Sequence, residues 1–297
     1  MERRDFLSLA AAGGGVVFAS GLVGCSTTGV SSASANSSDF FFVQLSDTHW
    51  GFKGPPNPES GETLKKAVAS VNALSVQPDF IVFTGDLTHT TDDPVERRRR
   101  LTEFKAIASE LKVKNVRFMP GEHDAALDNG AAYKEVFGET QYTFDHKGVH
   151  FIALDNVSDS GAKLGETQLK WLDAHLATRN KEAPMVVLTH RPLFDLAPTW
   201  DWATRDGAEA MAMLTPFKNV TVFYGHIHQE HHHMTGHIVH HSAKSLIFPL
   251  PAPLSQEKRT PLAWDPANPN KGLGWRQITT SVVAAAPKII EFPVVKT

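Results

Sequence analysis

The chain has 297 residues, of which 41% are hydrophobic and 21% are charged, and its formal net charge at pH 7 is −3. These proportions are ordinary for a soluble globular protein, and this length can bury one large hydrophobic core. A net charge so close to neutral gives no strong field toward a nucleic-acid polymer or an anionic membrane surface. We therefore expect a globular domain that binds no nucleic-acid polymer.

The first residues are typical of an export signal. The pair Arg3-Arg4 before an apolar run resembles a twin-arginine signal, and the end of that run at Cys25 resembles a bacterial lipobox. The run is short and glycine-rich for a membrane span. We expect residues 1–24 to be a signal peptide and Cys25 to carry a lipid, which would anchor an exported protein on the periplasmic side of a membrane. A plain exported protein and an uncleaved anchor are the alternatives.

The rest of the chain reads as a short linker followed by one domain. Cys25 is the only cysteine, which excludes an intramolecular disulfide, a cysteine nucleophile and a cysteine-type zinc site within the fold. Residues 25–38 are rich in Ser, Thr, Ala and Gly, a composition that favours a flexible tether. Residues 39–297 contain neither an internal repeat nor a break in composition, so we expect a single domain there.

Within this domain, strand-type and helix-type apolar patterns alternate along the chain. Alternation of this kind favours a largely parallel sheet. From residue 237 onward the pattern resembles antiparallel strands separated by proline-rich loops. The strands are numerous enough for an α/β fold of four layers, an αββα sandwich in which two packed mixed sheets are flanked by helices. The predicted strands are 41–45, 80–83, 115–119, 142–144, 149–154, 185–188 and 220–224, and the predicted helices are 62–74, 94–111, 166–179 and 208–214.

Residues that commonly bind metals follow several of these predicted strands. Asp47 and His49 stand two positions apart after the first strand, so in an extended backbone both side chains point to the same side. An oxygen and a nitrogen ligand that converge in this way suit a divalent transition metal. The same arrangement of strand, polar turn and ligand recurs four times, and it adds Asp86, Glu122, His123, Asp124, His190, His226 and His228.

Taken in order, these segments read D-x-H, G-D, G-x-H-D, H and G-H-x-H. The series resembles the calcineurin-like metallophosphoesterase superfamily over residues 40 to about 230. The resemblance implies hydrolysis of a small phosphate ester by a hydroxide that bridges two metal ions. Mixed carboxylate and imidazole ligands favour Mn, Fe or Zn as the metal.

The resemblance also implies a role for each residue. One ion would be held by Asp47, His49 and His228, and Asp86 would bridge both ions. His123 would be the catalytic acid or charge stabiliser at the phosphate, and Asp124 would orient His123 by a hydrogen bond. The second ion would be held by Glu122, His190 and His226.

One position departs from the pattern of the superfamily. Where the superfamily usually has Asn before the His, this chain has Glu122, which adds a negative charge to the site. We expect the added charge to tighten metal binding and to weaken the attraction for a dianionic phosphomonoester. A phosphodiester, which carries one negative charge, is therefore the favoured substrate.

Two other functions stay open at this point. The chain could be a phosphomonoesterase acting on nucleotides or sugar phosphates, or a degenerate lipoprotein that binds metal or ligand without turnover. Metal analysis together with a panel of monoesters and diesters distinguishes them. The run His231-His232-His233 is expected to be part of a solvated loop and hairpin, with a third metal site or a substrate contact as the alternative. Arg276 is a candidate phosphate contact in a loop.

Overall fold

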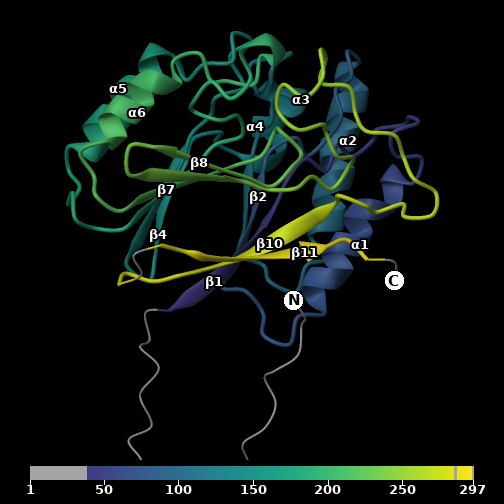
Figure 1. Ribbon diagram of the computed structural model, residues 1–297, viewed down its shortest axis with the longest axis horizontal. Helices are drawn as coiled ribbons and strands as arrows, with labels where there is room; N and C mark the ends of the chain where they lie inside the picture. Colours follow the sequence, from purple (N-terminus) through teal and green to yellow (C-terminus); the bar gives the residue numbers. More distant parts are fainter. Residues whose placement is uncertain (1–38, 284–285, 296–297) are drawn as a thin grey trace, which may run out of the picture. The chain divides into compact units, whose positions relative to one another are not determined.

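The computed structural model describes residues 39–283 and 286–295, which belong to the compact unit Asn36–Thr297. Two mixed β-sheets pack face to face in this unit, and helices cover the outer face of each sheet (Figure 1). The predicted α/β fold of four layers is therefore confirmed. The predicted signal peptide and the whole of the predicted tether lie outside the described residues.

The first sheet has five strands in the order β11-β10-β1-β2-β3. β1, β2 and β3 run parallel to one another, whereas β10 and β11 are antiparallel to their neighbours. Parallel pairing brings the carboxyl ends of β1, β2 and β3 to one edge of the sheet. The strand bounds are β1 Phe40–Leu45, β2 Phe80–Thr84, β3 Val116–Met119, β10 Gly274–Thr280 and β11 Lys288–Pro293.

The second sheet has six strands in the order β4-β5-β6-β7-β9-β8. β5, β6, β7 and β9 are parallel, and the antiparallel strands β4 and β8 form its two edges. The strand bounds are β4 Tyr142–His146, β5 Val149–Ala153, β6 Met185–Leu188, β7 Val220–Tyr224, β8 His231–Thr235 and β9 Ile238–Ser242.

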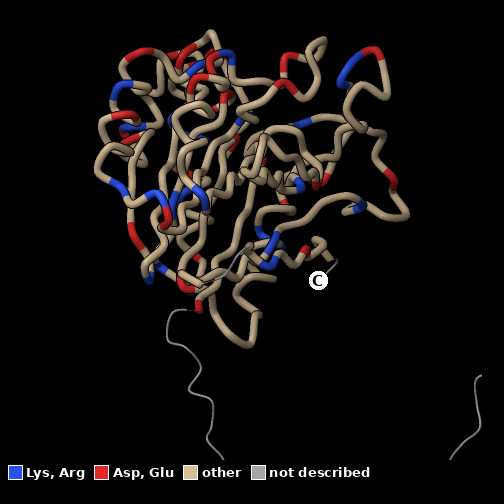
Figure 2. The backbone as a smooth tube through the Cα atoms, turned by 60° about the vertical axis from the view of Figure 1, so that its left-hand side comes forward, with Lys and Arg blue, Asp and Glu red and all other residues tan. Residues whose placement is uncertain are grey.

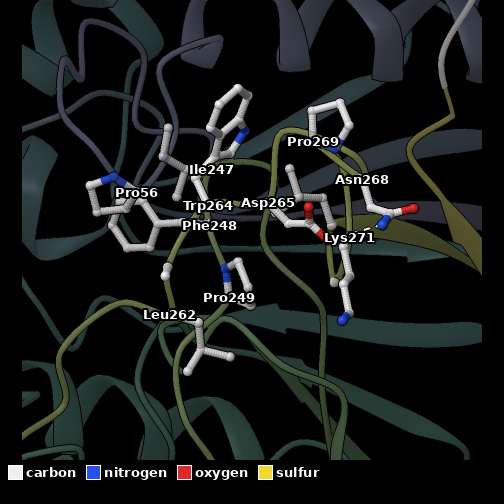
Figure 3. A pocket seen from close by; sticks show the side chains of 13 residues that line it. Pro56, Ile247, Phe248, Pro249, Leu262, Trp264, Asp265, Asn268, Pro269 and Lys271 are labelled. Carbon is white, nitrogen blue, oxygen red and sulfur yellow. Dashed lines mark hydrogen bonds between the residues drawn. The ribbon is translucent and has the colours of Figure 1, made fainter.

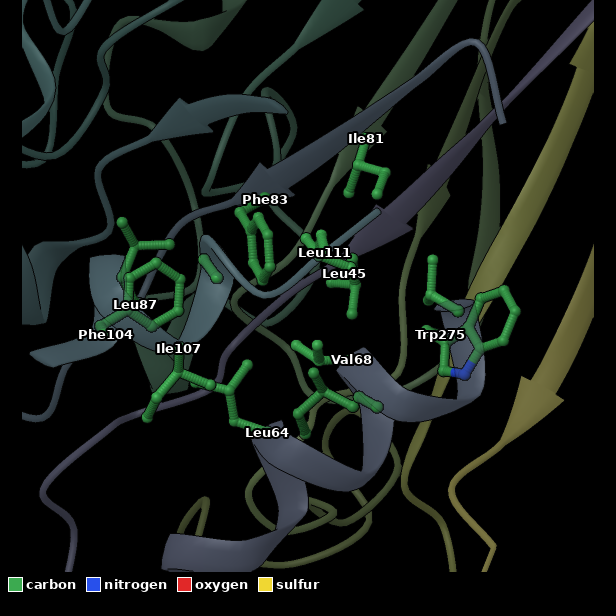
Figure 4. Close-up of a cluster of buried hydrophobic side chains, with 14 of the residues drawn as sticks. Leu45, Leu64, Val68, Ile81, Phe83, Leu87, Phe104, Ile107, Leu111 and Trp275 are labelled. Atoms are coloured by element: carbon green, nitrogen blue, oxygen red, sulfur yellow. The ribbon is translucent and has the colours of Figure 1, made fainter. Parts of the chain in front are cut away.

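Three hydrophobic clusters hold the layers together. Between the sheets, the aromatic rings of Phe42 and Phe80 stack at 4.8 Å and meet Phe151 of the opposite sheet edge to face. Outside the first sheet, Leu64 and Phe104 are among the helix side chains that pack on the strands (Figure 4). A third cluster joins the second sheet to its helices. Burial of this much apolar area on both faces of each sheet accounts for the layered arrangement.

The helices lie close to their predicted positions. α1 (Ser60–Asn72) and α2 (Pro94–Ala108) cover the first sheet, and α5 (Gly165–Leu176) and α6 (Gly207–Leu214) cover the second. α2 begins at Pro94 because the Asp93 carboxylate accepts hydrogen bonds from the backbone N–H groups of Val95 and Glu96. The structure adds two short helices, α3 (Glu122–Ala125) and α4 (Ala131–Phe137), and a 3₁₀ turn, η1 (Pro198–Trp200), which the sequence pattern does not predict.

The prediction that Arg276 contacts phosphate from a loop is wrong. Arg276 lies within β10 and is fully buried. Its guanidinium pairs with the Glu291 carboxylate at 2.7 Å and donates a hydrogen bond to the carbonyl of Ser242. A buried arginine needs such partners, so this side chain holds the strands together and does not bind a ligand.

The surface of the described residues agrees with the near-neutral net charge. Basic and acidic residues are interspersed along the backbone and do not gather into one region of a single sign (Figure 2). Among the helices in the described part of the chain, none has the length and hydrophobicity to span a bilayer.

Candidate metal centre

The candidate ligands stand on turns that follow the strands of both sheets. Asp47 follows β1, Asp86 follows β2, and His226 follows β7. Asp47, His49, Asp86, His226 and His228 all have positive φ angles, between 42° and 66°. This left-handed conformation costs free energy in residues other than glycine and is concentrated at functional sites.

Two glycines allow the ligand turns to approach one another. A Cβ atom at Gly121 would lie 2.0 Å from Oδ1 of Asp86, and a Cβ atom at Gly225 would lie 2.8 Å from Oδ2 of Asp47. Both distances are far below van der Waals contact. Any side chain at these positions would therefore push a carboxylate out of the site, which explains why glycine precedes the ligand segments.

The structure brings the seven predicted metal ligands into two adjoining groups. The first group is Asp47, His49, Asp86 and His228, and the second is Asp86, Glu122, His190 and His226. Within each group one atom of every side chain lies within 4.8 Å of the others. Asp86 belongs to both groups and is nearly fully buried. Its Oδ2 atom lies 3.4 Å from Nε2 of His49 on one side and 3.4 Å from Nε2 of His190 on the other.

Hydrogen bonds to backbone carbonyls orient two of the histidines. Nδ1 of His190 lies 2.7 Å from the carbonyl oxygen of Thr84, and Nδ1 of His228 lies 2.8 Å from that of Phe248. A carbonyl accepts only, so each Nδ1 carries the proton and each Nε2 keeps its lone pair. Both Nε2 atoms face the carboxylates of the site. This is the arrangement that supports metal-binding histidines in proteins.

The charges of the site fit metal ions. His190 is fully buried, which lowers its pKa, but the carboxylates of Asp86 and Glu122 outweigh burial and hold the pKa of His190 well above its ordinary value. The same negative field attracts divalent cations. Three buried ligand atoms that face one another, Nε2 of His190, Nδ1 of His226 and Oε2 of Glu122, also make no hydrogen bond. Buried polar atoms without partners are costly, and a metal ion would satisfy all three.

His123 lies beside these groups, but the role predicted for Asp124 is wrong. The Asp124 carboxylate accepts hydrogen bonds from the backbone N–H groups of Gly121, Leu87 and Thr88 and makes no contact with the His123 ring. Burial, reinforced by the Asp86 carboxylate, raises the pKa of Asp124 to about 7. Asp124 therefore fixes the loops that carry Asp86 and Glu122.

Thr90 is the residue that orients His123. Its backbone N–H donates to Nδ1 of His123 at 3.2 Å, and its hydroxyl lies 2.6 Å from the same nitrogen. Because Nδ1 accepts the backbone N–H, the proton of the neutral ring sits on Nε2. Nε2 lies 4.0 Å from Oδ2 of Asp86, so this proton faces the centre. No motif in the sequence points to Thr90, which reaches His123 only through the tertiary fold.

Glu122 contacts both histidines of the second group. Its Oε2 lies 2.9 Å from Nε2 of His190, and its Oε1 lies 2.9 Å from Nδ1 of His226. The guanidinium of Arg191 lies on the other side, with Nη1 4.0 Å from Oε1 of Glu122. The charge that Glu122 brings to the site therefore has a cationic partner, which the sequence argument did not include.

A cavity of about 200 Å³ opens over the centre, and a second cavity lies beside it. The first is lined by ligand residues together with His89, Phe248, Leu250, Arg259 and Pro261. The second, of about 210 Å³, shares Phe248 with the first and is otherwise mostly apolar (Figure 3). The loop of residues 247–273 thus contributes walls to both.

The histidine run after the last motif lies in a hairpin, as predicted. His231, His232 and His233 belong to β8, which pairs with β9. Nδ1 of His232 lies 2.6 Å from Nδ1 of His241, but these residues are not among the potential metal-binding groups of the described chain. His89 was not predicted as a site residue, yet it forms a third such group with His49 and His123.

This αββα fold and these paired groups of buried ligands are those of a metal-dependent phosphoesterase. The chain belongs to the calcineurin-like phosphoesterase family, whose sequence model matches residues 42–230. It is 25% identical over 202 residues to a "Probable cyclic nucleotide phosphodiesterase" of Rhodopseudomonas palustris, a match that covers 63% of this chain and 71% of that protein.

Two further similarities extend the comparison. The chain is 26% identical over 220 residues to the serine/threonine-protein phosphatase CPPED1 of Danio rerio, covering 65% of this chain and 71% of that one. The purple acid phosphatase PPD1 of yellow lupin (Lupinus luteus) matches in fold with a TM-score of 0.60 at 13% identity, covering 86% of this chain. This chain spans 52% of the lupin chain, and the likeness shows the fold alone.

Proposed function

We propose that this phosphoesterase hydrolyses a small phosphodiester with two transition-metal ions drawn from Mn, Fe and Zn. The observation that carries the proposal is the pair of four-residue groups that share Asp86 below one open cavity. Mixed carboxylate and imidazole donors of this kind suit those metals better than Mg or Ca. The name of the relative from Rhodopseudomonas palustris supports a diester as the substrate.

The residues of the chain divide the work between binding, orientation and stabilisation of the leaving group. Bound metal ions supply Lewis-acid chemistry, which activates water and neutralises phosphoryl oxygens. Asp47, His49 and His228 hold one side of the centre and Glu122, His190 and His226 the other, with Asp86 between them. The Nε2–H group of His123 would donate a hydrogen bond to the leaving oxygen of the ester and stabilise the charge that develops there.

A phosphomonoester is the second candidate substrate. It is supported by the name of the relative from Danio rerio, a serine/threonine-protein phosphatase. The two substrates differ in charge, because a monoester near neutral pH is mostly a dianion and a diester is a monoanion. Arg259, which lines the cavity over the centre, provides a positive charge that either substrate can use.

A panel of substrates tests the proposal. Protein stripped of metal with a chelator should be inactive, and added Mn should restore hydrolysis. For bis(4-nitrophenyl) phosphate, kcat/KM should exceed that for 4-nitrophenyl phosphate by about tenfold, which corresponds to about 1.4 kcal/mol of transition-state stabilisation. A preference for the monoester would replace the diesterase assignment with the monoesterase one. Absence of any hydrolysis with two ions bound would identify a metal-binding protein without turnover.

We also propose that the chain is exported and held at a membrane by a lipid on Cys25. The support is the sequence pattern alone, namely Arg3-Arg4 and the lipobox-like run that ends at Cys25. In a bacterial host, Cys25→Ser should abolish incorporation of labelled palmitate and release the protein from the membrane fraction. Arg3→Lys combined with Arg4→Lys should retain it in the cytoplasm. Normal export of that double variant would point to an ordinary secretion route.

A further inference from the structure

We propose that Arg191 is a positioning residue whose positive charge allows Glu122 to act as a metal ligand in place of a neutral amide. The inference rests on the metal centre of the proposed function. It adds that Glu122 and Arg191 act as one electrostatic unit, which sets the affinity for the second ion and the balance between singly and doubly charged substrates.

Arg191 is held rigidly beside the centre. Its side chain is only 5% exposed. Nε donates to the carbonyl of Ala203 at 3.0 Å, and Nη2 donates to the carbonyl of Asp201. The Arg191 backbone is fixed as well, since its carbonyl accepts a hydrogen bond of 2.8 Å from the Asn156 amide. These contacts leave Nη1 facing Glu122, so the guanidinium is placed before any ion or substrate binds.

The sequence position of Arg191 explains why it can reach Glu122. It directly follows His190, whose Nε2 contacts Oε2 of Glu122 at 2.9 Å. Nη1 of Arg191 lies nearest the other carboxylate oxygen, Oε1, at 4.0 Å. His190 and Arg191 therefore approach different oxygens of the Glu122 carboxylate, one as a fellow ligand and the other as a counter-charge.

The charge count shows what the pair achieves. Two divalent ions and two aspartates leave a charge of +2 for the nucleophile and the substrate when the remaining oxygen ligand is a neutral amide. Glu122 alone lowers this value to +1, and Arg191 offsets part of that loss, because its guanidinium is shared between Glu122 and the exposed Asp201 carboxylate, which lies 3.6 Å from Nη2. The Glu122 carboxylate contacts Nε2 of His190 directly at 2.9 Å, whereas Nη1 of Arg191 lies 4.0 Å from that carboxylate. The pair thus keeps a strong anionic ligand without the full cost in net charge.

Substitution of Arg191 and substitution of Glu122 should have opposite effects on the affinity for the second ion and on the substrate ratio. Arg191→Gln leaves an uncompensated carboxylate, so the second ion should bind about tenfold more tightly, and kcat/KM should shift toward diesters. Glu122→Asn leaves an uncompensated guanidinium, so the second ion should bind more weakly and the ratio should shift toward monoesters. The double variant should return close to the wild-type substrate ratio, because the net charge is restored.

The experiment is a double-mutant cycle in which metal affinity is the first quantity measured. Zn affinity for the second site would be measured by competition with a chromophoric chelator in the wild type, Arg191→Gln, Glu122→Asn and the double variant. The unfolding temperature of each metal-free protein would be measured alongside. Arg191→Lys keeps the charge and should preserve the wild-type affinity. Arg205→Gln is the matched control, because Arg205 is an exposed arginine that also contacts Asp201, and it should change nothing.

The outcomes separate this inference from the proposed function. A wild type that fails to bind two ions would overturn the metal centre itself. Two bound ions whose affinity and substrate ratio are unchanged by Arg191→Gln would overturn the pair, since a purely structural role of Arg191 in the loop at Asp201 predicts no shift that follows its charge. If Arg191→Gln does not fold, the comparison of Arg191→Lys with Glu122→Asn decides. Failure of Arg191→Lys to preserve the affinity would then count against a role for the charge.

Discussion

Asp86→Asn is expected to remove both metal ions together and to lower kcat/KM by about a thousandfold or more. Asp86 is the one side chain common to both groups of ligands in the described chain. Its Oδ2 atom is equally close to His49 and His190, so loss of its charge weakens both sites at once. Metal analysis of the variant after gel filtration would show close to zero ions, where the wild type shows two.

Asparagine is the appropriate substitution because it preserves shape. Asp86 has a φ angle of 50°, a conformation that asparagine tolerates better than alanine does. Asp79→Asn provides the matched control, since Asp79 directly precedes β2 at its opposite end and pairs with Lys147 at 2.7 Å. The control should retain two ions and full activity. Two tightly bound ions in the Asp86 variant would show that another residue bridges the sites.

The sequence alone identified the seven ligand candidates because the parallel fold places them by a simple rule. Each buried strand ends at the same edge, and a carboxylate or imidazole follows it. Asp47, Asp86 and His226 illustrate this, since each stands two positions after the last residue of a strand. Hydrophobic runs of strand length are strong local signals, so both the strands and the residues at their ends could be predicted.

Residues that join the site by tertiary contact could not be found in this way. Thr90 lies 33 positions from His123, and Arg191 lies 69 positions from Glu122. Neither belongs to a motif, and a single threonine or arginine in a loop carries no local signal. The charge of the site cannot be obtained from its ligands alone for this reason, because the fold brings the Arg191 guanidinium close to Glu122.

Asp124 and Arg276 show the complementary error, in which a polar residue near a motif is taken for a functional group. Both are buried and held by their own neighbours, Asp124 by backbone N–H groups and Arg276 by Glu291. Buried charged side chains need such partners simply to be tolerated in the interior. Composition cannot distinguish a residue that supports the site from one that takes part in its chemistry.

His123→Ala should keep both metal ions but lose turnover on esters with poor leaving groups. His123 belongs to neither of the two ligand groups that share Asp86, so metal content should stay at two ions. The proton on its Nε2 matters most when the departing oxygen is strongly basic. We expect kcat for an alkyl ester to fall by about a hundredfold to ten-thousandfold, and that for a 4-nitrophenyl ester to fall far less.

Thr90→Val tests whether the hydroxyl of Thr90 contributes to holding His123 for this hydrogen bond. Valine retains the backbone N–H that donates to Nδ1 and removes only the hydroxyl that lies 2.6 Å from it. A ring held mainly by the backbone should lose less than about tenfold in kcat, whereas reliance on the hydroxyl would make the variant resemble His123→Ala. Thr91→Val is the control, because Thr91 contacts Asp93 rather than His123.

Full activity of His123→Ala on the alkyl ester would show that His123 takes no part in the chemistry. His89, which lines the same cavity, would then be the remaining imidazole there outside the two ligand groups.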